Sequence, residues 1–191
     1  WYHLVLRRSH NSTVSLFRDG VQILSQTVLT GNNATNLNLD FGFSTAADSR
    51  NPNWGMYPYN GEMDEFRLYN RALTNFEVAQ LYNMDTPKKF GAAYGLAGHY
   101  QFDEGDGRDS GLLGNNGTLK GSVRRVTDRL GRPNKAVEFN GTAQYLEVSS
   151  ATAGNFSAFN MPNTKSLTLS AWVKPDSLLA NNWILANRDG G

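Results

Sequence analysis

Short stretches of alternating apolar and polar residues recur along most of the chain. The alternation is clearest from 167 to 173, where every odd-numbered residue is apolar. A period of two is typical of a β-strand that has one face in the core. The strands predicted in this way cover residues 1–8, 13–18, 21–28, 37–43, 96–103, 136–140, 144–149, 167–174 and 183–187.

The stretch 61–78 predicts one more strand, which leads directly into a short helix. Phe66 and Leu68 fall on one side of this strand, and the charged residues next to them fall on the other. Thr74 and Glu77 then have the spacing of a capping box, the usual start of a helix. No longer helix is predicted in the chain.

Asp64 has the parity of Phe66, so it is predicted to point toward the core, where a carboxylate needs a hydrogen bond, an ion pair or a metal. The loop 103–117 is rich in carboxylate, amide and carbonyl oxygens, the ligands that calcium prefers. It is not an EF-hand, because the spacing and the flanking helices are missing. The alternative to a calcium site is a loop of Asx turns whose backbone hydrogen-bonds Asp64 without a metal.

A second candidate site is the stretch 53–60, which contains Trp54, Tyr57 and Tyr59. Aromatic rings stack on sugars, and nearby amides can read hydroxyl groups, so these three residues are the candidate ligand-binding residues. The more ordinary interpretation, which residue type alone favours, is a small aromatic cluster that pins a long loop to a sheet.

Composition favours an all-β sandwich and limits the partners. Of the 191 residues, 39% are hydrophobic and 18% are charged, and glycine occurs 19 times, so turn formers are frequent. Asp19-Gly20, between two predicted strands, is a hairpin signal because both residues tolerate positive φ. The formal net charge is +1 and the basic residues are dispersed, which argues against a nucleic-acid partner.

Membrane insertion is not predicted, because no apolar run approaches the length of a membrane span. No signal peptide is visible, but the chain begins in mid-pattern at Trp1, so such a signal could lie elsewhere in a longer chain. The absence of cysteine excludes disulfides and thiolate metal sites without placing the compartment.

Five runs of the chain share one resemblance: GEMDEFRLYNRALTNFEVAQLY, GLAGHYQFDEGDGRDSGLLGNNGTLKG, AVEFNGTAQYLEV, SLTLSAWVKPD and WILANRDG. Together they resemble laminin-G-like domains of the concanavalin A-like lectin/glucanase superfamily. The resemblance touches most of the chain and implies a jelly-roll β-sandwich of two antiparallel sheets with one short helix.

The order of these runs is the reverse of the order in the family. Residues 1–83 resemble the C-terminal half of such a domain, 84–94 read as a linker, and 95–191 resemble the N-terminal half. The chain could be a piece cut across two tandem domains, a circular permutant, or a subunit that exchanges halves with copies of itself. We expect that 1–83 and 95–191 complete one sandwich.

The resemblance also implies a structural calcium. Carried over by matching motif, its ligands are Asp64, Asp109 and Asn116, completed by backbone carbonyls. Leu112-Leu113 replaces the polar pair that the family usually has in this loop, so the loop is better matched than its ligand set.

Catalysis is not expected, although the superfamily includes glucanases. Glu62-Met63-Asp64 begins like the catalytic strand of a glucanase, but the required second Glu is replaced by Phe66 and Arg67. The histidines His3, His10 and His99 have no metal-ligand or triad spacing.

The function that the resemblance implies is a non-catalytic, extracellular or cell-surface module for carbohydrate or glycoprotein binding and adhesion, with a structural calcium. The alternative is a structural repeat that assembles into fibres, or spaces other domains, by exchanging sandwich halves.

Overall fold

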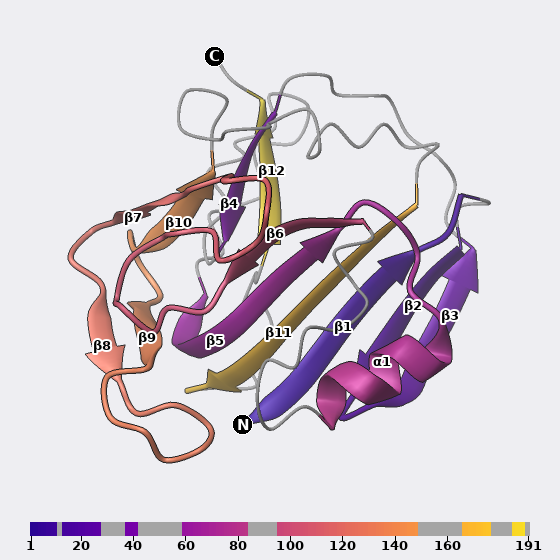
Figure 1. The fold of residues 1–191 in the computed structure, drawn as a ribbon, viewed down its shortest axis with the longest axis horizontal. Helices are drawn as coiled ribbons and strands as arrows, with labels where there is room; N and C mark the ends of the chain where they lie inside the picture. The colour runs from indigo at the N-terminus through magenta and orange to yellow at the C-terminus, as the bar shows by residue number, and fades with distance from the viewer. Residues whose placement is uncertain are drawn as a thin grey trace.

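The computed structural model describes residues 1–10, 13–27, 37–41, 59–83, 95–148, 166–176 and 185–189. Within these ranges the chain forms two antiparallel β-sheets and one helix, as predicted (Figure 1). The larger sheet contains β1 (Tyr2–Arg8), β2 (Thr13–Arg18), β3 (Val21–Thr27), β5 (Asn60–Tyr69), β6 (Leu96–Tyr100), β8 (Arg124–Val126), β9 (Ala136–Asn140) and β11 (Leu167–Pro175). The smaller sheet contains β4 (Leu37–Phe41), β7 (Thr118–Lys120), β10 (Tyr145–Val148) and β12 (Leu185–Asp189).

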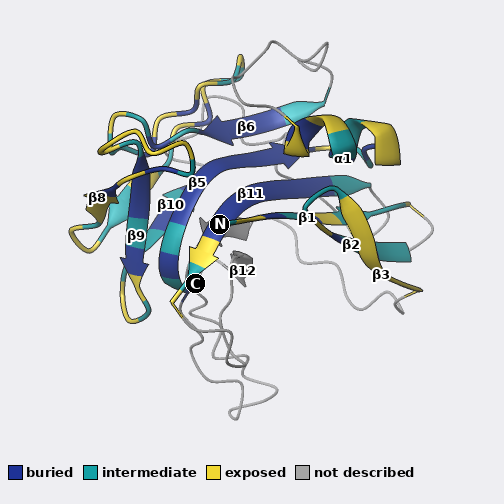
Figure 2. Cartoon of the chain, turned by 90° about the horizontal axis from the view of Figure 1, so that it is seen from below, coloured by how far each residue is buried: buried dark blue, intermediate teal, exposed yellow. Residues whose placement is uncertain are grey.

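The main core lies between the two sheets. Met63, Phe66 and Leu68 of β5 pack with Leu146 and Val148 of β10, and each of the five side chains is at most 1% exposed. Apolar residues of β6, β9 and β11 complete this cluster. Figure 2 shows β5 and β11 buried along most of their length, which makes them the centre of the larger sheet.

The outer face of the larger sheet, opposite the main core, carries helix α1 (Asn75–Tyr82) and a second apolar cluster. Val78 and Leu81 of the helix are buried against Val5, Phe17 and the residues that precede the helix. This helix is too short to cross a membrane, and no other helix occurs in the described ranges.

The capping box at the start of α1 is present as predicted. The Glu77 amide donates to Thr74 Oγ1 at 3.2 Å, and the Thr74 amide donates to Glu77 Oε2 at 2.7 Å. Arg71 adds an ion pair to the same Glu77 carboxylate at 2.6 Å. These contacts fix the point at which the chain turns from β5 into the helix.

In the middle of the larger sheet, strands from the two segments of the chain alternate. The order is β3-β2-β1-β11-β5-β9-β8, with β6 also paired to β5. Consequently β11 lies between β1 and β5, and β5 lies between β11 and β9. For this reason β1, in indigo, and β11, in gold, lie side by side in Figure 1. The predicted linker, 84–94, is outside the described residues.

The face of β5 on which Asp64 lies is not the predicted one. The register with β11 pairs Arg67 with Ser170 and Asp64 with Trp172, so three steps along β5 match two along β11. The extra residue forms a β-bulge at Glu65, whose φ is 52°. The bulge reverses the alternation, and Asp64 therefore shares the outer face with Arg67 instead of the core face with Phe66.

Candidate functional site

The carboxylate of Asp109 organises the loop 103–117. Its Oδ1 accepts hydrogen bonds from the amides of His99 at 2.9 Å and Gly111 at 2.7 Å, and its Oδ2 accepts one from Asn115 at 2.8 Å. The Asp109 amide in turn donates to Asn116 Oδ1 at 3.0 Å. Two of the predicted calcium ligands, Asp109 and Asn116, are therefore brought together, and both accept backbone N–H groups; the bond from Gly111 to Asp109 is that of an Asx turn.

The third predicted ligand, Asp64, has a different electrostatic environment. It is 1% exposed, and its Oδ1 has no hydrogen-bond partner among the described residues. Burial, together with the nearby carboxylates of Glu65 and Asp128, raises the pKa of Asp64 to about 8. Asp109 is not among the main causes of this shift.

The oxygens of Asp109 and Asn116 are satisfied by amide donors, so this part of the loop requires no cation. In the described part of the chain, no three His, Asp or Glu side chains are grouped as a metal site. The residues present fit a hydrogen-bonded loop better than a calcium shell, and calcium binding stays a prediction.

Of the three candidate ligand-binding residues, only Tyr59 lies within the described residues. Trp54 and Tyr57 lie outside the described residues. Tyr59 is 1% exposed, packs edge-on against Phe139, and donates its hydroxyl proton to the carbonyl of Glu62 at 3.0 Å. Its ring has no surface to offer a ligand, which corrects the binding role that the sequence indicated for this residue.

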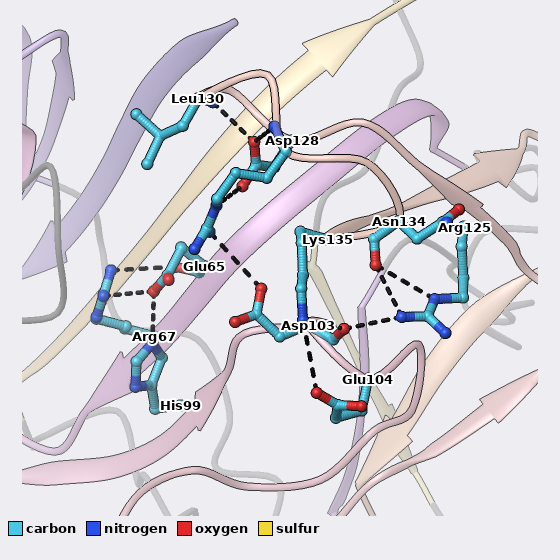
Figure 3. Close-up of polar contacts among 11 residues, drawn as sticks. Glu65, Arg67, His99, Asp103, Glu104, Arg125, Asp128, Leu130, Asn134 and Lys135 are labelled. Carbon is cyan, nitrogen blue, oxygen red and sulfur yellow. Dashed lines mark hydrogen bonds and ion pairs between the residues drawn. The ribbon is translucent and has the colours of Figure 1, made fainter.

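A buried ionic network occupies the outer face beside Asp64 (Figure 3). Glu65 Oε2 accepts from Arg67 Nη2 at 2.5 Å and from His99 Nε2 at 2.7 Å, and all three residues are at most 8% exposed. Burial alone would raise the pKa of Glu65, but the His99 hydrogen bond and the Arg67 charge outweigh it and lower this pKa to about 2. Burial lowers the pKa of His99, so its neutral ring donates through Nε2.

A second histidine on the same face is equally enclosed. His3 Nε2 lies 2.8 Å from Ser170 Oγ, and its ring lies 5.1 Å from that of Trp172. Burial and the charges of Arg67 and Arg129 lower the pKa of His3 to about 3. The His3–Ser170 pair resembles a base and its nucleophile, but both residues are at most 1% exposed and cannot meet a substrate.

Farther along the outer face, four charged side chains form a row across four strands. The register places Lys174 of β11 beside Glu62 of β5, Glu62 beside Glu138 of β9, and Glu138 beside Arg124 of β8. Lys174 Nζ contacts Glu62 Oε1 at 3.0 Å, and Arg124 Nε contacts Glu138 Oε2. We call these four residues the charged row.

An open pocket of about 520 Å³ lies over the charged row. Its lining includes Lys174, Glu62 and Arg124 of the row, together with Trp1 and two residues of the following loop, Asp128 and Asn134. This volume is within the range of small-molecule sites. The sequence did not indicate this pocket, because its residues come from strands that are distant in the chain.

The carboxyl groups of Glu62, Glu138 and Asp64, in and beside the pocket, are ion-paired or buried. Acid–base hydrolysis requires one accessible carboxyl group that is protonated near neutral pH. The Arg124 hydrogen bond lowers the pKa of Glu138, and Glu62 is ion-paired with Lys174. Asp64 has a raised pKa, but it is buried and does not line the pocket.

Comparison with known proteins gives one family match. Residues 1–79 match the laminin G family model described as "Concanavalin A-like lectin/glucanases superfamily". The match covers β1 to β5 and the first part of α1. No curated protein and no solved structure matches the chain. The match does not reach 95–191, and the reversed order of the two segments stays a prediction.

Proposed function

We propose that this chain is a non-catalytic carbohydrate- or glycoprotein-binding module of an extracellular or cell-surface protein. The observation that carries the proposal is the open pocket on a lectin-type β-sandwich, lined by an aromatic residue and by paired charges. The match of residues 1–79 to a lectin and glucanase superfamily supports it. The carboxylate of Glu62, which lines the pocket, is ion-paired with Lys174, and this pairing favours recognition over catalysis.

A screen of the purified chain against immobilised oligosaccharides tests this function. We expect retention on a subset of glycans that is competed by the same glycan in solution, because a pre-formed site selects by shape and by hydroxyl position. The control is the chain unfolded in urea and applied under the same conditions. Binding to no glycan, with the folded chain intact by circular dichroism, would contradict the proposal.

The interleaved strands favour a second candidate function, assembly by exchange of halves. Because β11 lies between β1 and β5, a chain that received β11 from a neighbour would keep the same strand pairs. Under this proposal 95–191 is the first half of a domain whose second half is 1–83. Light scattering is then expected to show a mass that increases with concentration, whereas a monomer at every concentration would exclude exchange.

A further inference from the structure

We propose that β3 is a pairing edge: two copies of this chain associate by aligning their β3 strands antiparallel, with Leu24 of one copy opposite Leu24 of the other. The larger sheets of the two copies then form one continuous sheet across a two-fold axis. This inference does not depend on the carbohydrate-binding function. It also differs from the exchange of halves, because each copy keeps all of its own strands.

The strand β3 stands at one end of the larger sheet. Among the described strands it pairs with β2 alone, and Figure 1 shows it at the end opposite to β8. One side of its backbone therefore presents N–H and C=O groups that no other described strand meets. Such an edge is a template for one more strand. With seven residues, β3 is longer than the usual strand of about five or six, so it offers a ladder of several hydrogen bonds.

The composition of β3 favours pairing with another strand. Its sequence, VQILSQT, contains no charged residue, no proline and no glycine, and all seven residues are exposed. Val21, Ile23 and Leu24 are each half exposed or more. Proteins discourage pairing at an edge by placing charges or proline there, and β3 has neither. Uncharged segments of this length with high β-propensity pair readily between chains.

The other sheet edges in the described part of the chain are protected in ways that β3 is not. The far end of the larger sheet is β8, which has three residues, two of them arginine. In the smaller sheet, β7 has three residues and ends in a lysine, and β12 ends in an arginine and an aspartate. The loop 103–117 covers β6, because Asn115 Nδ2 donates to the carbonyl of Ala97 and the Ser110 amide donates to that of His99, both at 2.7 Å. Short, charged or covered edges resist pairing, so β3 is the described edge that is open to a partner.

A row of leucines crosses the larger sheet and ends at β3. The strand register places one leucine of each of β5, β11, β1, β2 and β3 opposite the next, and these are Leu68, Leu169, Leu6, Leu16 and Leu24. Opposed residues of antiparallel strands share a face, and Leu68 and Leu169 belong to the main core. The exposed fraction rises from 1% at Leu68 to 37% at Leu6 and 50% at Leu24. We call these five residues the leucine row; it continues the core face to an open end.

A second copy fits this edge because its own leucine row ends in the same way. When the two β3 strands are antiparallel and centred on Leu24, the two rows join, and each Leu24 covers the other. Ile23 of each copy then lies opposite Ser25 of the other. No like charges oppose each other along the pair, because β3 carries none. The contact uses the same residues on both copies, as the interface of a closed dimer does.

A β-bulge limits the strength of this contact. The register of β2 and β3 shifts between Leu16 and Phe17, which leaves Ile23 as the extra residue of β3. The bulge interrupts the ladder beside the axis, so the pair should bury less than a standard interface of about 1,600 Å². We therefore expect a reversible dimer with a dissociation constant between about 10 μM and 1 mM.

Sedimentation equilibrium over a concentration series that spans this range tests the assignment. We expect the average mass to rise from that of one chain toward that of two. Leu24→Lys should weaken the association about tenfold or more, because the axis would then set two ammonium groups against each other at the end of the leucine row. Its exposed position means that the variant should fold, which circular dichroism checks.

The matched control is Leu112→Lys, which adds the same charge to the chain. Leu112 lies in the loop 103–117 and is more exposed than Leu24, so its side chain is an equally available apolar group away from β3. The dissociation constant of Leu112→Lys should stay within about twofold of that of the unsubstituted chain.

A single cysteine tests the alignment of the two strands. The chain has no cysteine, so Leu24→Cys carries one thiol for each copy. Residues directly opposed in antiparallel strands have Cα atoms about 4.5–5.5 Å apart, a separation that a disulfide spans. In a glutathione redox buffer we expect Leu24→Cys to form the linked dimer about tenfold or more faster than Leu112→Cys, because pairing raises the effective concentration of the thiols.

The outcomes separate edge pairing from the exchange of halves. Oligomers that persist unchanged in Leu24→Lys would overturn edge pairing and leave exchange as their cause. A monomer at every concentration would overturn both. Equal rates of dimer formation by the two cysteine variants would overturn the alignment on Leu24. The glycan screen tests carbohydrate binding separately, so failure of one proposal does not imply failure of the other.

Discussion

Replacing Glu65 with Gln is expected to lower the free energy of unfolding by about 3–5 kcal/mol. The Glu65 carboxylate neutralises the Arg67 guanidinium and accepts from His99, and both partners are less than 10% exposed. Gln has nearly the same shape but no charge, so the buried cation of Arg67 would be left without compensation. Urea denaturation followed by circular dichroism at pH 7 measures the change.

The matched control is Glu138→Gln, which breaks a carboxylate–arginine pair at the surface. The side chain of its partner, Arg124, is 68% exposed, so water replaces the lost contact and the expected change is below about 1 kcal/mol. A loss below about 1 kcal/mol for Glu65→Gln as well would mean that the buried network does not stabilise the fold.

The same carboxylate predicts how stability falls in acid. The pKa of Glu65 is lowered to about 2 in the folded chain from 4.5. The unfolded state therefore binds the proton first, and the stabilisation is present above pH 4.5 and lost as the pH falls from 4.5 to 2. Glu65→Gln should show a weaker dependence of stability on pH in this window.

The elements that are determined by residues close together in the sequence were predictable from the sequence. Strand alternation places the strands to within a few residues, and the capping box of Thr74 and Glu77 has the predicted contacts. Asp19 and Gly20 both have positive φ, at 51° and 80°, as the hairpin signal indicates. Each of these features is determined by residues less than ten positions apart. The strands β7 and β8 were missed because three residues are too few to show a period.

The candidate sites depend on geometry that local patterns do not contain. The bulge at Glu65 moves Asp64 to the other face, and no glycine or asparagine marks it, because Glu65 itself adopts a φ of 52°. Tyr59 adjoins an aromatic-rich stretch yet lies in the core. The pocket combines residues 62, 124 and 174, which only the strand register brings together. Once the strand order and register are known, the charged residues at matching positions of β11, β5, β9 and β8 indicate the charged row.

Replacing Asp64 with Asn is expected to stabilise the chain at pH 8 by about 4–6 kcal/mol. The pKa of Asp64 is raised from 3.8 to about 8 in the folded state, mainly by burial. Above pH 4 the unfolded state loses this proton while the folded state keeps it, so the penalty grows from pH 4 to pH 8 and is then constant, at about 1.4 kcal/mol for each pKa unit. Asn imitates the protonated carboxyl and avoids the penalty, so the gain should be near zero at pH 4.

Asp109→Asn is the matched control, because the same substitution should have the opposite sign. The Asp109 carboxylate accepts three amide N–H groups, and an Asn side chain would turn its NH₂ group toward at least one of them. The expected loss is about 1.5–3 kcal/mol, the range for hydrogen bonds to charged groups. Urea denaturation of both variants at pH 4, 6 and 8 measures the two changes. A pH-independent loss in Asp64→Asn would contradict the protonated, buried carboxyl.

Repeating these measurements in calcium and in EDTA tests the calcium prediction with the same proteins. A metal that binds only the folded chain stabilises it by mass action, and it requires ionised ligands. If Asp64 and Asp109 hold calcium, the ion stabilises the unsubstituted chain, and both variants lose that response. If calcium has no effect and the two Asn variants shift in opposite directions, Asp64 is a protonated carboxyl and Asp109 is an acceptor for the loop backbone. The two substitutions therefore separate a hydrogen-bonded loop from a metal site, because only the metal couples Asp64 to Asp109.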